Sequence, residues 1–247
     1  MRALFADLRR ESALAFTLIE LLVVIAIVAI LAAIAFPAMR STLLSAKSAE
    51  SLSNQKQIGV MVANYAAENN NRLPYAAVWQ KIFGNQLVYF SRTVAEGADP
   101  KFKYGEAPHT RKRPLPSIFY DPCLEGESRE QHEMGAFGVN RSVVTDTWTD
   151  NPSQPGYTPP TLLSSIARPS QKVILCSVGL KSAAESGGWL FTGDDFAKQG
   201  TSLDGGPDPR NAGGAAALFA DGHVEKLDVK NMDKATRELL FTTNSTP

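Results

Sequence analysis

The longest apolar run of the chain lies near its N-terminus. The sixteen residues from Leu21 to Phe36 carry no charge, and Glu20 stands directly before them. The 21 residues from Phe16 to Phe36 would form a helix of about 31 Å, long enough to cross the hydrocarbon core of a membrane. A carboxylate at the start of such a helix is costly without a partner, so we expect Glu20 to pair with a positive charge.

An amphipathic pattern follows the apolar run. Pro37 predicts a kink rather than an end, because the residues from Met39 to Glu68 contain no further proline and Gly59 as their only glycine. Apolar side chains recur there at helical spacing, at Ile58, Met61, Val62 and Tyr65. The sequence therefore predicts one long helix from about Phe16 to Asn69, ended by three asparagines and Pro74.

The rest of the chain reads as short elements joined by loops. A second helix is expected around Ala76 to Phe83, and a final helix from about Asp233 to Leu240. Strands are expected at 117–120, 136–140 and 172–177, and a hairpin at 215–227. The Asp221-Gly222 pair favours a type I′ turn, which needs a positive φ at both central residues. Proline- and glycine-rich loops are expected at 94–116, 146–160 and 182–214.

Composition limits the function classes. The chain has 25 basic and 25 acidic residues, so nothing in its charge favours a nucleic acid as partner. No phosphate loop, dinucleotide fingerprint or nucleophile elbow occurs, and the carboxylates show no paired motif, so we expect no catalytic site and no enzyme activity. Aromatic residues at Trp148, Tyr157 and Trp189 lie in polar loops, where they would either bind glycans or proteins or cover the core.

Two further chemical features remain open. Cys123 and Cys176 would form one disulfide in an oxidising compartment, or would be two buried free thiols. The loop carboxylates offer weak candidates for a calcium site and no zinc motif, and the same residues are common in turns. The candidate ligands are Asp194, Asp195, Asp204, Asp208, Asp221 and His223, and our expectation is that the chain has no cofactor.

The N-terminal residues resemble the signal of type IV prepilins and type II secretion pseudopilins. A short leader with Arg2, Arg9 and Arg10 precedes Phe16-Thr17-Leu18-Ile19-Glu20. The resemblance implies that prepilin peptidase cuts between Ala15 and Phe16 and methylates Phe16. Glu20 matches the acidic fifth residue of the mature family proteins, and Pro37 matches their helix-kinking proline. Ala15 departs from the glycine that usually precedes the cut.

The C-terminal half resembles a family of prepilin-like proteins with the signature His, nine residues, then Asp-Gly. Asp221-Gly222 matches the end of that signature, whereas Asn211 stands in place of the histidine. Four other segments agree with the family pattern, namely Gln57-Ile58-Gly59, Asp121-Pro122-Cys123, Gly138-Val139-Asn140 and Arg168-Pro169-Ser170.

Together these features predict an α+β pilin-like fold, with a long N-terminal helix packed on an antiparallel sheet. The expected divisions are a leader at 1–15, a transmembrane half-helix at 16–36, an outer half-helix at 37–70 and a globular head at 71–247. Basic residues before the apolar run favour a cytoplasmic N-terminus and a periplasmic head, at the cell surface once assembled. The implied partners are prepilin peptidase, other pilin subunits and inner-membrane lipid.

Three alternatives remain beside a filament subunit. The chain would be a minor, ligand-binding pilin-like subunit if the loop with Trp189, Asp194 and Asp195 contacts a ligand. It would be a membrane-anchored protein that never polymerises if Glu20 has no assembly role. Ordinary signal-peptide cleavage near Ala32-Ala33-Ile34-Ala35 would release a secreted protein instead.

Overall fold

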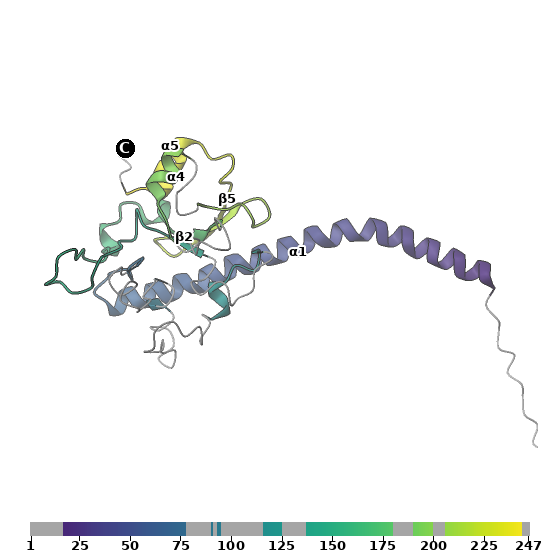
Figure 1. Cartoon of the computed structure of the whole chain (residues 1–247), viewed down its shortest axis with the longest axis horizontal. Helices are drawn as coiled ribbons and strands as arrows, with labels where there is room; N and C mark the ends of the chain where they lie inside the picture. The colour runs from purple at the N-terminus through teal and green to yellow at the C-terminus, as the bar shows by residue number, and fades with distance from the viewer. Residues whose placement is uncertain are drawn as a thin grey trace, which may run out of the picture. The chain divides into compact units, whose positions relative to one another are not determined.

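A computed structural model describes residues 17–77, 90, 93–94, 116–124, 137–179, 190–199 and 206–243. The chain divides into two compact units, 1–43 and 44–247. The helix α1, Leu18–Glu68, contributes to both, and Figure 1 shows it as the longest element of the chain. We call Leu18–Leu43 the stem segment, Leu44–Glu68 the packed segment, and residues 44–247 the head unit.

The predicted long helix is confirmed within two residues at its start and one at its end. It runs from Leu18 to Glu68 rather than from Phe16 to Asn69, and it continues through Pro37. Its end is a turn in which Asn70 and Asn71 adopt positive φ angles of 53° and 61°, as asparagine readily does. The expected helix at 76–83 is not present at Ala76 and Ala77, and its other residues lie outside the described part of the chain.

The head unit contains one sheet with strand order β3-β1-β2-β4-β5. Its strands are β1 (Phe137–Asn140), β2 (Val173–Ser177), β3 (Leu190–Phe191), β4 (Ala215–Phe219) and β5 (Val224–Leu227). β1, β2, β4 and β5 pair antiparallel, and with α1 they confirm the predicted α+β fold. The edge strand β3 differs, because it runs parallel to β1.

Each face of the sheet packs against its own hydrophobic core. Residues of β2 contribute to both cores. On the face toward the packed segment, Ile58 and Val62 share a cluster with Ile174 and Leu175. On the other face, Val173 and Cys176 cluster with residues of the two short helices α4 (Gly193–Gln199) and α5 (Lys234–Phe241). The register of β2 against β4 shifts between Val173 and Leu175, so two consecutive residues face α1.

The helices α4 and α5 lie together on the sheet face opposite the packed segment (Figure 1). Phe196 of α4 meets Phe241 of α5 edge to face, with ring centroids 5.0 Å apart. Gly193 begins α4 where a Cβ atom would lie 2.0 Å from the carbonyl oxygen of Phe241. Only glycine can be accommodated this close to the carbonyl. Glycine usually indicates a loop, but at position 193 it is required by packing.

Three sequence predictions are wrong in detail. Residues 117–119 form a 3₁₀ helix (η1) rather than a strand. The loop predicted for 182–214 contains β3 and α4. In the β4–β5 hairpin only Gly222 has a positive φ, of 87°, and its N–H donates to the carbonyl of Phe219; this geometry is a type I turn in a longer loop rather than type I′.

The final helix follows its sequence signal closely. Asp233 caps α5, and its carboxylate accepts a hydrogen bond of 2.9 Å from the N–H of Thr236. At the other end, the Lys172 ammonium donates to the carbonyls of Leu239 and Thr242, both at 2.6 Å. A cation at a helix C-terminus is favourable because the unpaired carbonyls concentrate negative charge there.

Candidate assembly site

The helix α1 begins with a reciprocal hydrogen-bonded pair. The N–H and the hydroxyl of Thr17 both donate to Oε2 of Glu20, at 2.8 and 2.7 Å. The N–H of Glu20 donates back to Oγ1 of Thr17 at 3.3 Å. This arrangement is a capping box, in which Thr17 is the N-cap and Glu20 is the third helical residue. The spacing Thr-x-x-Glu is the sequence signal for this box, so Glu20 has a local partner in Thr17 besides the positive charge expected from the sequence.

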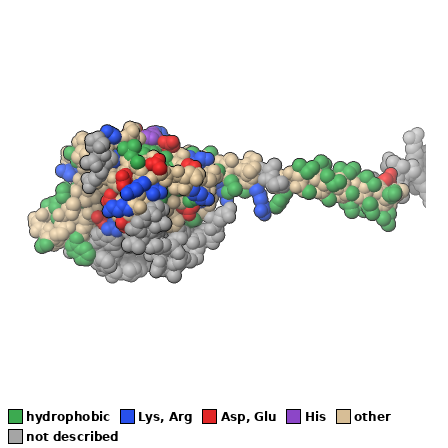
Figure 2. Space-filling model, turned by 90° about the horizontal axis from the view of Figure 1, so that it is seen from above, with side chains coloured by type: hydrophobic (Ala, Val, Ile, Leu, Met, Phe, Trp, Pro, Cys, Tyr) green, Lys and Arg blue, Asp and Glu red, His purple; other side chains and the backbone are tan. Residues whose placement is uncertain are grey.

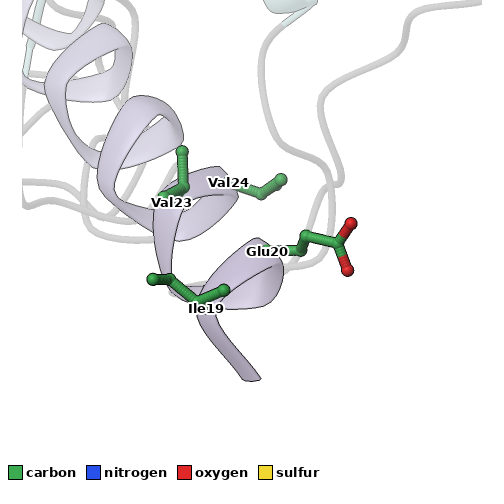
Figure 3. A pocket seen from close by; sticks show the side chains of 4 residues that line it. All are labelled: Ile19, Glu20, Val23 and Val24. Carbon is green, nitrogen blue, oxygen red and sulfur yellow. The ribbon is translucent and has the colours of Figure 1, made fainter. Parts of the chain in front are cut away.

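The carboxylate of Glu20 remains accessible in spite of these bonds. Figure 3 shows its side chain pointing away from the helix axis, beside Ile19, Val23 and Val24. These four side chains line an open depression on the surface of the stem segment. The carboxylate has a second oxygen beside the one that Thr17 occupies, so a cation on a neighbouring molecule has an acceptor available.

The stem segment presents apolar side chains on all sides. Its large hydrophobic residues from Leu18 to Leu43 are all exposed, with Leu18 at 82% and Ile34 at 70%. In Figure 2 the corresponding helix surface is mostly hydrophobic, with few charged side chains. Among the described residues, α1 is the one helix long and apolar enough to cross a membrane. A helix that is hydrophobic all round needs lipid or other protein around it.

The proposed cleavage and methylation residues, Ala15 and Phe16, lie outside the described residues. Pro37 lies within α1, at a point where the helix is continuous. The proposed roles of these residues therefore stay predictions from the sequence.

The weak metal candidates are not brought together. Asp194 and Asp195 lie in the first turn of α4, Asp208 pairs with Arg210 at 3.1 Å, and Asp204 lies outside the described residues. Asp221 accepts hydrogen bonds from its neighbour His223 in the hairpin turn. Burial is the largest single influence and raises the pKa of the Asp221 carboxyl, but the hydrogen bonds and the electrostatic attraction from His223 together lower it below its ordinary value. In the part of the chain that the structure describes, no three His, Cys, Asp or Glu side chains are grouped as metal ligands.

The two cysteines are buried free thiols in the structure. Burial raises the pKa of the Cys123 thiol to about 11, and burial also raises the pKa of Cys176 well above its ordinary value. A protonated, buried thiol is a poor nucleophile, so neither cysteine has the environment of a catalytic residue.

Asn211, which stands in place of the signature histidine, meets Asp121 and Ser177 in one buried polar cluster. Asn211 donates to Oγ of Ser177 at 2.8 Å and to Oδ2 of Asp121 at 3.3 Å. Ser177 donates to the same oxygen of Asp121 at 2.7 Å. All three side chains are at most 3% exposed. Because the cluster joins β2 to two loops and is closed to solvent, its geometry is that of a structural contact.

A comparison with protein-family models finds one match. Residues 12–36 match the prokaryotic N-terminal methylation motif. No curated protein and no solved structure matches the chain. Proteins with this motif are structural subunits rather than enzymes. The matched residues contain the capping box, the accessible carboxylate of Glu20 and most of the exposed apolar surface, and together they support a membrane-anchored, single-pass precursor of the type IV pilin or pseudopilin type.

Proposed function

We propose that this chain is a precursor subunit of a type IV pilus or a type II secretion filament. Prepilin peptidase would remove residues 1–15 and methylate Phe16. The mature protein would wait in the inner membrane, with its head in the periplasm, and would then be added to a filament. The observation that carries the proposal is the match of residues 12–36 to the N-terminal methylation motif.

The exposed apolar surface of the stem segment has to be covered both before and after assembly. Lipid covers the apolar side chains before assembly, and the stem segments of other copies cover them afterwards. Burial of apolar surface is worth roughly 25 cal/mol per Å² relative to water, but lipid is as apolar as leucine. Packing and polar contacts therefore have to favour the filament over the membrane.

Glu20 supplies such a polar contact. In a filament, the ammonium of Phe16 in one subunit would pair with the carboxylate of Glu20 in the next, and the pair would set the axial register of the subunits. The second candidate function, a membrane-anchored protein that does not polymerise, also has an observation in its favour. The capping box gives Glu20 a local role that requires no neighbouring copy.

Two matched variants separate these functions. Glu20→Gln keeps the capping box, because glutamine also serves at that position, but removes the charge. Thr17→Val removes the capping hydroxyl and keeps the charge. If Glu20 acts in assembly, Glu20→Gln abolishes cross-linking between copies in the native membrane, whereas Thr17→Val is cleaved and still cross-links. If its role is capping alone, Glu20→Gln behaves as the wild type.

The first experiment is intact mass and N-terminal sequencing of the protein from its native membrane, with and without prepilin peptidase. We expect a mature form that starts at methylated Phe16 and is lost without the peptidase. An uncleaved chain would contradict the proposal and favour a plain membrane anchor. A start near Ala35 would indicate ordinary secretion, and the assembly role of Glu20 would then be lost.

A further inference from the structure

The loop of residues 145–161, here called the Trp loop, extends from the head unit without regular secondary structure (Figure 1). Its base is closed by hydrogen bonds to the chain that follows α1. The N–H of Ala76 donates to the carbonyl of Thr145 at 2.9 Å, and the N–H of Thr147 donates to the carbonyl of Ala77 at 3.0 Å. The hydroxyls of Thr145 and Thr161 lie 2.7 Å apart across the base.

The interior of the Trp loop is held by buried threonine side chains. Thr147 is 2% exposed, and its hydroxyl donates to the carbonyl of Thr149 at 2.8 Å and accepts from the N–H of Thr158 at 2.9 Å. The hydroxyl of Thr149, which is also 2% exposed, donates to the side chain of Gln154 at 3.2 Å. These bonds hold both sides of the loop in one conformation, so little conformational entropy remains to be lost on binding.

The Trp loop presents Trp148 to solvent. The side chain is 49% exposed, and it is the only large hydrophobic side chain outside α1 that is exposed among the described residues. The backbone N–H of Trp148 donates to the carbonyl of Gly156 at 3.2 Å. Gly156 has a φ of +85°, and a Cβ atom there would lie 2.9 Å from Cβ of Trp148. Glycine at this position therefore lets the far side of the loop support the base of the tryptophan.

The chemistry around Trp148 is polar and poor in positive charge. From Ser142 to Ala167 the sequence contains no lysine or arginine. Of its two aspartates, Asp146 pairs with Arg141 at 2.8 Å. The exposed side chains that can form hydrogen bonds carry mostly amides and hydroxyls, as in Asn151, Ser153, Gln154 and Thr158.

This composition discriminates between classes of partner. A polyanion such as nucleic acid or a phosphorylated glycan requires several cationic side chains. The loop itself supplies none, and Arg141 and Arg72 at its base are engaged with Asp146 and with the carbonyl of Pro160. A protein interface is usually centred on several apolar or aromatic anchors, whereas only one large hydrophobic side chain is exposed here. A neutral sugar needs one aromatic face for its C–H groups and several neutral hydrogen-bonding groups for its hydroxyls.

We propose that the Trp loop is a binding surface for a neutral glycan. The indole of Trp148 stacks on the C–H face of one sugar ring, and the amide and hydroxyl side chains of the loop bind the sugar hydroxyls. This activity is independent of filament assembly, since all its residues lie in the head unit. It would give a membrane-anchored chain or an assembled filament a contact with polysaccharide.

The test uses the full chain in detergent micelles on an array of neutral and acidic glycans. We expect retention on neutral glycans that does not weaken when salt is raised, because no ion pair contributes. Trp148→Ala should weaken binding about tenfold or more, as for a central aromatic contact. Trp148→Phe should retain part of the affinity, and Gly156→Ala should weaken binding by displacing the tryptophan.

The controls separate binding from folding. Val60 of α1 is a similarly exposed hydrophobic residue, at 54%, and Val60→Ala should bind as the wild type does. Thermal unfolding of the Trp148→Ala protein should match that of the wild type. The proposal is overturned if the array retains no neutral glycan, if it retains acidic glycans alone, if Trp148→Ala binds unchanged, or if Trp148 is needed only for capture of a protein.

Discussion

The stem segment and the packed segment belong to one helix and invert the usual relation between polarity and burial. The stem segment is almost wholly apolar, yet each of its large hydrophobic side chains is exposed. The packed segment is rich in polar residues, yet Ser48, Ser51, Asn54 and Gln55 are all buried there. The apolar sequence of a helix therefore shows which surroundings the helix requires. Whether a given side chain is buried depends on which other parts of the same chain pack against it.

Polar side chains of the packed segment donate hydrogen bonds to the rest of the head unit. The amide of Gln55 donates to the carbonyl of Ala216 in β4 at 2.9 Å. The amide of Asn54 donates to the carbonyl of Tyr120 at 3.4 Å, and the ammonium of Lys56 donates to the carbonyl of Gly222 at 2.8 Å. Three consecutive residues thus join the helix to the sheet, the 3₁₀ segment and the hairpin turn.

The largest expected effect comes from removing core volume in the packed segment. Ile58 is fully buried, and Ile58→Ala should lower the free energy of unfolding by about 2–5 kcal/mol through lost burial and the cavity left behind. Urea unfolding of the full chain in detergent, followed by near-ultraviolet circular dichroism, measures the loss.

The matched substitution in the stem segment is Ile30→Ala. Ile30 is 61% exposed, so the unfolding free energy of the head unit should change by less than about 0.5 kcal/mol. Equal losses for the two variants would mean that the two segments do not differ in packing, and the comparison would fail.

A smaller effect is expected from the polar contact of Gln55. Gln55→Ala removes the hydrogen bond to Ala216 and leaves a gap in a buried interface, at an expected cost of about 1–2 kcal/mol. Gln57 is the matched control, because its side chain is exposed and bonds only within α1, to the carbonyl of Ser53 at 3.5 Å. The same urea titration should show almost no change in unfolding free energy for Gln57→Ala. A loss as large as that of Gln55→Ala would argue against a stabilising role of the hydrogen bond from Gln55 to Ala216.

The smallest expected effect is a pH dependence of stability that is due to a buried cation, Lys172, in the head unit. The described part of the stem segment has no buried cation. Lys172 is 1% exposed, and burial, with a further contribution from Arg168, lowers the pKa of its ammonium below 10.5. The folded protein therefore loses this proton before the unfolded chain does. The stability that Lys172 contributes should rise as the pH rises from its folded pKa to 10.5, and should be lost as the pH falls through that folded pKa.

Unfolding free energies of the wild type and of Lys172→Met, compared at about pH 8 and about pH 10.5, isolate this term. We expect the difference between the two proteins to shift in favour of the wild type at the higher pH. A difference that is constant or shifts the other way would show that the two carbonyls at the end of α5 hold the charged form more strongly than burial opposes it.

Much of the fold was predictable where a signal is local and repeated. The bounds of α1 followed from helical spacing and the asparagine stop, and the hairpin from Asp221-Gly222 between two strand-like runs. Asp233 marked the start of α5 by its capping side chain. The helix α4 was missed because it has seven residues and begins at Gly193, a residue that usually indicates a loop. Glycine is required at position 193 because the carbonyl oxygen of Phe241 lies too close for a Cβ atom. No local sequence pattern predicts this contact.

The residues of the candidate site could be named from the sequence, but not all of their contacts could be predicted. The motif around Phe16 and Glu20 could be read from consecutive residues, and the family-model match to 12–36 agrees with it. The bond between Thr17 and Glu20 is local and could have been predicted from its spacing. The cluster of Asp121, Ser177 and Asn211 could not, since these residues are distant in the sequence and meet only across β2 and two loops.

The sequence by itself determined the apolar helix and its need for apolar surroundings, because an uncharged run of that length has to be covered by lipid or by other protein. It also determined the position of Glu20 and, within one residue, the bounds of β1 and β2. Only the tertiary structure decided that polar residues of the packed segment are buried, that β3 runs parallel to β1, and that Trp148 stands exposed on a rigid loop. These outcomes depend on which groups face each other across the sheet and the loops, and such pairings arise from packing rather than from the order of neighbouring residues.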